Sequence, residues 1–161
     1  MRWKGSVDEV ATFLDGGKLP CLLVENKADL LDYDIAEKSP ELEEFGSSNG
    51  FCGTFRTSAK TGLNINESME YLIKNIIQRM EAMQSKGNEV FTTDRKSVAL
   101  DPEKHNEVAQ KRKQKDGKLY RIQLWDLAGQ DKNAMVTKIF AKDAHGCVVM
   151  ADATNSQTRD E

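Results

Sequence analysis

The chain has 161 residues, of which 39% are hydrophobic and 30% charged, and its formal net charge is −3. This length suffices for one domain with a substantial core, the lack of an apolar run near ~20 residues excludes a membrane-spanning helix, and the weakly acidic balance gives no reason to expect nucleic-acid binding. Cys21, Cys52 and Cys147 are an odd number of cysteines without C-x-x-C spacing, so we expect core residues in a reducing compartment rather than a disulfide framework or a zinc site.

The first half of the chain alternates between helical and strand-like patterns. Residues 2–15 carry apolar side chains at spacings of three and four, which predicts an amphipathic helix. The apolar run at residues 20–24 predicts a strand buried on both faces of a parallel sheet. Residues 29–44 are acidic and predict a solvated loop and helix face, residues 51–57 predict a second short strand, and residues 64–83 predict a long helix with an apolar stripe.

The second half begins with a polar interval. Residues 84–117 have no sustained apolar period, which predicts a tail or linker. Residues 118–125 alternate between apolar and polar side chains and predict a strand with one wetter face. Residues 133–143 predict a helix, and residues 146–151 predict a fourth strand. This alternation indicates an α/β fold with a mainly parallel sheet, in which ligands bind at the carboxyl ends of strands.

The motif Asn26-Lys27-Ala28-Asp29 directly follows the first predicted strand. The Asp29 carboxylate can accept two hydrogen bonds from the ring N–H and the exocyclic amine of guanine. A purine without that amine would leave a buried acceptor unpaired, at a cost of roughly 1–3 kcal/mol. The stem of Lys27 can lie over the base and Asn26 can brace the loop. A polar turn after a strand is the alternative interpretation.

The motif Ser58-Ala59-Lys60 follows the second predicted strand. The backbone N–H of Ala59 could donate to the guanine oxygen, and Lys60 could pack on the base. A loop leading into a helix explains these three residues equally well when they are taken alone. Their position one strand after the first motif favours a shared base site.

The run Trp125-Asp126-Leu127-Ala128-Gly129-Gln130 is the most specific of the three motifs. An aspartate at a strand end, here Asp126, can hold a magnesium ion through water. Gly129 lets a backbone N–H approach a terminal phosphate, and Gln130 can orient an attacking water. A strand ending in a turn does not explain why these residue types stand together.

Together the three motifs resemble the Ras superfamily of small GTPases, and within it the Rab family. Residues 120–130 resemble the Rab strand that leads into switch II, while residues 50–60 and 135–140 resemble the Rabs that serve lysosome-related organelles. The resemblance implies a P-loop-NTPase-like fold, a mostly parallel sheet flanked by helices. Residues 1–83 would be the C-terminal half of the GTPase domain, residues 84–117 a hypervariable tail or linker, and residues 118–161 the switch II segment and following strand of the same domain.

The resemblance also implies GTP or GDP with Mg²⁺ as cofactors, Rab effectors and regulators as partners, and the cytosolic face of endomembranes as location. Asn26, Lys27 and Asp29 would read guanine with support from Ser58, Ala59 and Lys60. Asp126 would reach magnesium through water, Gly129 would sense the terminal phosphate, and the catalytic residue Gln130 would position water.

The order of the motifs departs from the family. In a Rab the W-D-x-A-G-Q run precedes N-K-x-D and S-A-K, whereas here it follows them. Residues 157–161 would run almost directly into residues 1–4 in the usual order. We therefore expect neighbouring termini and a circularly permuted, incomplete domain, since a surface loop tolerates a chain break. A spliced rearrangement or a gene-model error would produce the same sequence.

The sequence also contains no G-x-x-x-x-G-K-S/T phosphate loop and no C-terminal cysteine motif for prenylation. We expect weak phosphate binding. By the resemblance, the first family strand, the helix after the loop, switch I and the next strand are missing. The gap between the strands at residues 118–125 and 146–151 would be about twice the 4.8 Å strand spacing. Those strands either pair directly or leave exposed edges.

Three functions follow. The first is a Rab-like small GTPase that acts as a molecular switch in vesicle trafficking, present as a rearranged partial chain; without the phosphate loop we expect no measurable GTP turnover. The second is a non-catalytic Rab-like protein-interaction module. The third is a naturally permuted GTPase of the ribosome-assembly type, which would need a phosphate loop between Lys60 and Asp126, where the sequence has none.

Overall fold

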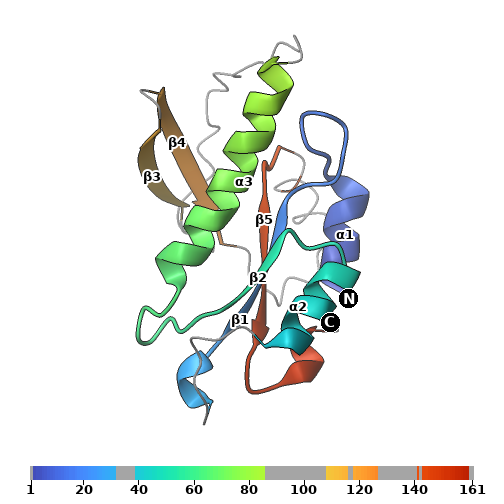
Figure 1. The fold of residues 1–161 in the computed structure, drawn as a ribbon, viewed down its shortest axis with the longest axis vertical. Helices are drawn as coiled ribbons and strands as arrows, with labels where there is room; N and C mark the ends of the chain where they lie inside the picture. The colour runs from blue at the N-terminus through green and yellow to red at the C-terminus, as the bar shows by residue number, and fades with distance from the viewer. Residues whose placement is uncertain are drawn as a thin grey trace. The chain divides into compact units, whose positions relative to one another are not determined.

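The computed structural model describes residues 2–31, 39–85, 108–115, 118–126, 141 and 143–159. The chain divides into two compact units, Met1–Phe91 with Ala141–Glu161, and Thr92–Phe140. The first unit contains helices α1 (Arg2–Val10), α2 (Pro40–Ser48) and α3 (Ile65–Ser85) and strands β1 (Cys21–Asn26), β2 (Gly53–Arg56) and β5 (Cys147–Asp152) (Figure 1). The second unit contains strands β3 (Val108–Lys115) and β4 (Lys118–Trp125).

The strands of the first unit form a parallel sheet in the order β2-β1-β5. In the ladder, Leu23 of the central strand lies opposite Thr54 of β2 and Val149 of β5. Residues 21 to 23 are fully buried, which is what a strand covered on both faces requires. The expectation of an α/β fold with a parallel sheet is thereby confirmed.

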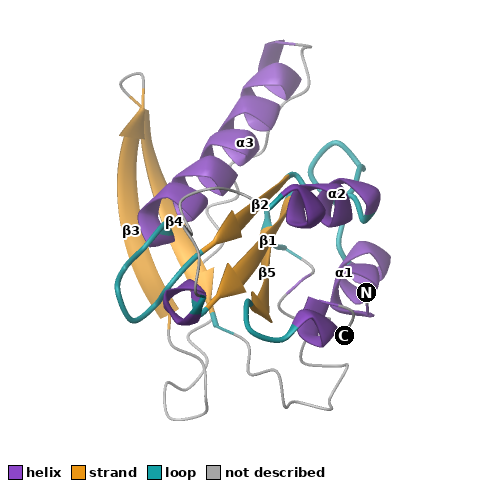
Figure 2. Cartoon of the chain, turned by 60° about the horizontal axis from the view of Figure 1, so that its bottom comes forward, coloured by secondary structure: helices purple, strands orange, loops and turns teal. Residues whose placement is uncertain are grey.

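Helices cover both faces of this sheet because successive side chains of β1 point to opposite sides. Leu23 packs in a cluster with Val7 of α1 and Leu42 of α2, whereas Leu22 packs with Leu72 of α3. Figures 1 and 2 show α3 on one side of the strands and α1 and α2 on the other. The sheet is therefore the middle layer of the first unit.

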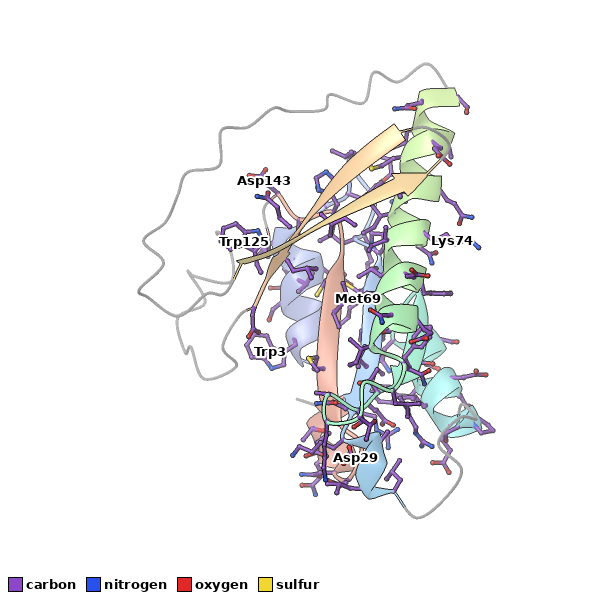
Figure 3. All side chains as sticks on the ribbon, turned by 90° about the vertical axis from the view of Figure 1, so that its left-hand side faces the viewer. Trp3, Asp29, Met69, Lys74, Trp125 and Asp143 are labelled. Carbon is purple, nitrogen blue, oxygen red and sulfur yellow. The ribbon has the colours of Figure 1, made fainter. Side chains whose placement is uncertain are left out.

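Helix α3 extends over nearly the range that its apolar period predicts. Met69 is half-buried and lies on the side of the helix that faces the strands, while the exposed Lys74 lies on the opposite side (Figure 3). This separation of apolar and charged residues is that of a helix with one face on a core.

Strand β3 corrects the interpretation of residues 84–117 as tail or linker. It pairs antiparallel with β4 along its whole length, from Val108 opposite Trp125 to Lys115 opposite Lys118. The polar composition of β3 concealed it, although the Asp-Gly pair at residues 116–117 is a strong sequence signal for a tight hairpin. Which strand of the family β3 corresponds to, and hence which family elements are missing, stays a prediction, as do the domain boundaries.

Strand β5 pairs with β1 in the first unit, and β4 pairs with β3 in the second. The expectation that the strands at residues 118–125 and 146–151 either pair directly or leave exposed edges stays a prediction. The two ends of the chain lie close together in Figures 1 and 2, which agrees with the expected neighbouring termini, and the permuted order itself stays a prediction. Of the helix expected at residues 133–143, only residues 141 and 143 lie within the described residues. No helix in the described ranges is both long and apolar enough to cross a membrane.

Candidate functional site

The two motifs that follow β1 and β2 lie side by side at one edge of the sheet. Beyond the strands, the N–H of Thr57 donates to the carbonyl of Glu25 at 2.8 Å, and the N–H of Ala28 donates to the carbonyl of Thr57 at 2.9 Å. These bonds continue the pairing of the parallel neighbours into their loops. The structure therefore brings residues 26–29 and 58–60 together, as their positions after adjacent strands predict.

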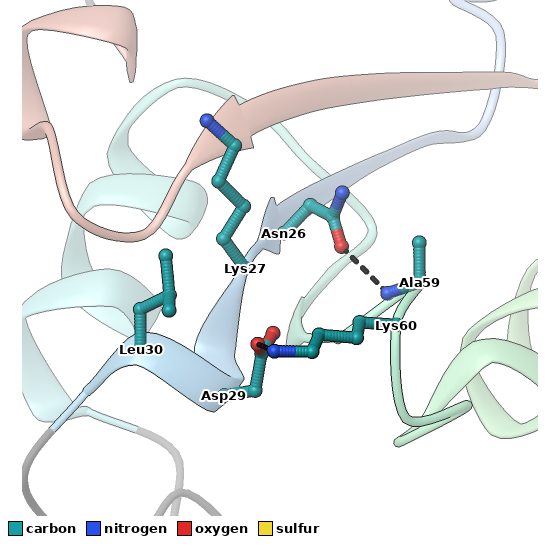
Figure 4. Close-up of a pocket in the computed structure, with 6 residues that line it drawn as sticks. All are labelled: Asn26, Lys27, Asp29, Leu30, Ala59 and Lys60. Carbon is teal, nitrogen blue, oxygen red and sulfur yellow. Dashed lines mark hydrogen bonds and ion pairs between the residues drawn. The ribbon is translucent and has the colours of Figure 1, made fainter.

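Asn26 braces this edge. Its Oδ1 accepts a hydrogen bond from the backbone N–H of Ala59 at 3.0 Å and one from the Thr57 hydroxyl at 3.5 Å (Figure 4). Its main-chain carbonyl accepts a third from the N–H of Ala153, at 2.8 Å, beyond the end of β5. The Ala59 N–H, which the sequence assigns to the guanine oxygen, is thus engaged by Asn26 in the structure, and a base oxygen would have to share or replace that contact.

Asp29 is held by Ser58. The buried Ser58 hydroxyl donates to Oδ1 of Asp29 at 2.6 Å and also accepts the N–H of Thr61 at 3.2 Å. The Asp29 Oδ2 lies 3.9 Å from Nζ of Lys60, whose side chain is 79% exposed. Each carboxylate oxygen can accept two hydrogen bonds, so the carboxylate keeps capacity for two N–H donors of a ligand while Ser58 fixes its direction.

Lys27 adopts an unusual backbone conformation between these groups. Its φ of 69° lies in the left-handed region, which costs a side-chain-bearing residue of order 1–3 kcal/mol. Its Nζ donates to Oδ2 of Asp152 at 2.6 Å. This hydrogen bond, joined by hydrogen bonds from Thr154, lowers the pKa of Asp152 to about 2. Sequence reasoning missed Asp152, although it ends a strand beside β1 and lies opposite Asn26 in the ladder.

A cavity of about 330 Å³ opens among these residues, within the range of small-molecule sites. Figure 4 shows Lys27 and Asp29 on the β1 side and Lys60 on the loop after β2. Its lining consists of five predicted site residues and one that the sequence did not indicate, namely Asn26, Lys27, Asp29, Ala59, Lys60 and Leu30. Leu30 is 59% exposed and adds an apolar surface suited to a flat ring.

The third motif belongs to the second unit. Asp126 follows β4 and is exposed, whereas Gly129 and Gln130 lie outside the described residues. Among the described residues, no group of three histidine, cysteine or acidic side chains could hold a metal ion. The carboxylate of Asp126 could accept hydrogen bonds from water bound to a magnesium ion. This role of Asp126 stays a prediction.

Comparison with known proteins identifies one family model and several relatives. The family model, described as "Ras of Complex, Roc, domain of DAPkinase", matches residues 75–161. Ras-related protein Rab-32 of Sus scrofa is 30% identical over 89 residues, which cover 55% of this chain and 39% of that protein. Ras-related protein Rab-7L1 of Homo sapiens is 38% identical over 77 residues, covering 48% of this chain and 37% of that protein. Ras-related protein Rab-32A of Dictyostelium discoideum is 31% identical over 78 residues, covering 48% and 36%.

The matches are partial on both sides. The chain spans 39% of the length of the first of these relatives and 37% of the second. The stretch matched by the family model contains Asp126 and β5 but not the residues that line the cavity on β1 and β2. The cavity residues are thus a feature of this chain that lies apart from the family-model match.

Proposed function

We propose that the edge of the sheet where the motifs after β1 and β2 lie binds the base of a guanine nucleotide. The reason is that this chain belongs to the small GTPases of the Roc and Rab kind. The observation that carries the proposal is the Asp29 carboxylate, which the Ser58 hydroxyl fixes at 2.6 Å beside the cavity. Guanine presents a ring N–H and an amine side by side, and a fixed carboxylate complements that pair. Adenine presents a ring acceptor there instead, which would oppose the charge of Asp29.

The neighbouring residues have distinct tasks in this proposal. The stems of Lys27 and Lys60 are apolar walls for the faces of the ring, since a lysine stem covers apolar surface while its ammonium stays in water. Asn26 holds the loop of Ala59 in place through the 3.0 Å hydrogen bond. Leu30 adds a further apolar contact at the rim.

The selectivity expected from Asp29 is considerable. A hydrogen bond to a charged group contributes about 1.5–3 kcal/mol, which corresponds to roughly ten- to hundredfold in affinity per bond. Removing the amine of the base, as inosine does, should lose one such bond. Replacing guanine by adenine should lose both.

The proposal also covers the residues that, by the family resemblance, would act on the phosphates of the nucleotide. Asp126, Gly129 and Gln130 would act on magnesium, the terminal phosphate and the attacking water, respectively. Magnesium supplies charge neutralisation of the phosphates when it is bound. A role of the whole protein as a molecular switch on endomembranes, with effectors and regulators as partners, is supported by its Ras-related relatives.

Nucleoside titration tests base recognition without any phosphate contact. Guanosine, inosine and adenosine are titrated into the chain by calorimetry or by NMR, with the wild type compared with Asp29→Ala and with Glu44→Ala, which removes an exposed carboxylate of α2. We expect guanosine to bind most tightly, and we expect only the Asp29 variant to lose this preference. Equal affinities for guanosine and adenosine in the wild type would reject the proposal.

A second variant reverses the preference. Asp29→Asn presents an amide N–H to position 2 of the base, where xanthosine has an oxygen in place of the amine. We expect this variant to prefer xanthosine to guanosine. GTP turnover is measured separately, and we expect none, because the sequence has no phosphate loop. A chain that binds no nucleoside would favour the non-catalytic interaction module.

A further inference from the structure

The carboxyl end of β5 places an aspartate beside the candidate base site. Asp152 is the last residue of β5 and lies opposite Asn26, the last residue of β1. Its Oδ2 accepts the ammonium of Lys27 at 2.6 Å, and its Oδ1 accepts the backbone N–H and the hydroxyl of Thr154 at 2.9 and 2.7 Å. Both carboxylate oxygens are therefore committed, and the direction of the side chain is fixed.

The turn that carries Asp152 is itself tied down. The N–H of Asp152 donates to the Thr158 hydroxyl at 2.8 Å, and its carbonyl accepts the N–H of Asn155 at 3.0 Å. The next residue, Ala153, donates its N–H to the Asn26 carbonyl at 2.8 Å. A carboxylate on so well-connected a turn is a rigid anchor for the long side chain that it binds.

Lys27 needs such an anchor. Its side chain is 55% exposed, while that of Asp152 is only 21% exposed. A lysine stem in solvent samples many rotamers, and ordering it on ligand binding opposes affinity. In the structure the ammonium is directed toward the end of β5, and the stem lines the cavity (Figure 4).

We propose that Asp152 is a positioning residue for base binding, holding the ammonium of Lys27 so that the lysine stem forms a preorganised wall of the cavity. This inference rests on the proposed recognition of guanine. The hydrogen bond from Lys27 keeps the pKa of Asp152 at about 2, so the carboxylate remains charged throughout the neutral range. Asp152 acts through Lys27 and makes no contact with the base.

A double-mutant cycle separates this role from a structural one. Guanosine affinity is measured for the wild type, Asp152→Asn, Lys27→Met and the double variant; methionine keeps an apolar stem without the charge. Since exposed ion pairs contribute modestly, we expect Asp152→Asn to weaken guanosine binding about two- to fivefold in the wild type, and to have no further effect when residue 27 is methionine.

The matched control is Asp15→Asn. Asp15 also pairs with a cation, Arg79, and that pair lies outside the cavity. We expect this variant to bind guanosine like the wild type. Melting curves of every variant show whether the fold is retained, so a loss of binding can be separated from unfolding.

The outcomes are distinct. Unchanged affinity in Asp152→Asn, or equal weakening by that change in both backgrounds, overturns the positioning role while leaving base recognition intact. A wild type that does not bind guanosine overturns both proposals. A carboxyl titration by NMR adds a ligand-free readout: the pKa of Asp152 should rise from about 2 toward its ordinary value of 3.8 in Lys27→Met, and an unchanged titration would show that the pair does not exist in solution.

Discussion

Glu25 offers the sharpest test of how the first unit is held together. It is the residue before Asn26, and only 3% of its surface is exposed. Its Oε2 lies 3.3 Å from Nε of Arg56 at the end of β2, and its Oε1 lies 3.1 Å from Nε of Arg159 near the C-terminus. One buried carboxylate thus joins the central strand, the edge strand and the last segment of the chain.

Replacing Glu25 by alanine should be strongly destabilising. Breaking a buried ion pair by removing one partner costs about 3–5 kcal/mol, because the remaining charge is left uncompensated. The arginine side chains are 10% and 19% exposed, so some solvent reaches them and we expect about 3 kcal/mol. For a chain of this size that loss lowers the melting temperature by about 6–12 °C.

The measurement is the free energy of unfolding by urea, with melting curves in parallel. Arg159→Met is the control, since it removes one cation but leaves the pair between Glu25 and Arg56; we expect a loss of about 1 kcal/mol. A loss below 1 kcal/mol for Glu25→Ala would refute the reasoning and would mean that the carboxylate is as weakly coupled as an ordinary surface pair.

Three further predictions concern single side chains. Lys27→Gly should raise the free energy of unfolding by about 1 kcal/mol, because glycine adopts the left-handed conformation without strain, while guanosine affinity falls; urea titration and nucleoside titration check the two effects. Cys147 should react with iodoacetamide before Cys21 as followed by mass spectrometry, because Cys147 is partly exposed whereas Cys21 is fully buried. Burial raises the pKa of Asp8, but hydrogen bonds from two neighbouring lysines outweigh this and hold the pKa below 3.8. The stabilising contribution of the Asp8 carboxylate is therefore present above pH 3.8 and is lost as the pH falls below that value. Replacing the residue by Asp8→Asn should then flatten the acid end of a plot of unfolding free energy against pH.

The parallel sheet of the first unit could be predicted because its signals are local. The short apolar run at residues 20–24 needs burial on both faces, and this identifies the central strand. Residues 26–29 and 58–60 each follow a predicted strand of a parallel sheet. Both motifs should therefore lie at the carboxyl ends of the strands, which is where ligands bind in such sheets. The structure confirms that arrangement through the hydrogen bond between Asn26 and Ala59.

Other features depend on partners that are distant in the chain. Asp152 is 125 positions from Lys27, and nothing in the local sequence links them before the order of the strands is known. Strand β3 carries polar residues at most positions, so its identity depends on pairing with β4 rather than on an apolar period. The hydrogen bond from the Ala59 N–H to Asn26 likewise could not be predicted, because it depends on how two loops lie against each other in space.

The residues proposed to bind the base all belong to the first unit, whereas those proposed to act on the phosphates belong to the second. Asn26, Ser58 and Asp29 are fixed by hydrogen bonds within the first unit, so the proposal predicts that affinity for a nucleoside depends on that unit alone. Asp126 belongs to the second unit, and phosphate loops normally supply most of the contacts to a nucleotide's phosphates. Any gain in affinity from guanosine to GDP must therefore come from residues outside this sheet edge. Equal affinities for the two ligands would assign all recognition in this chain to the edge formed by β1, β2 and β5.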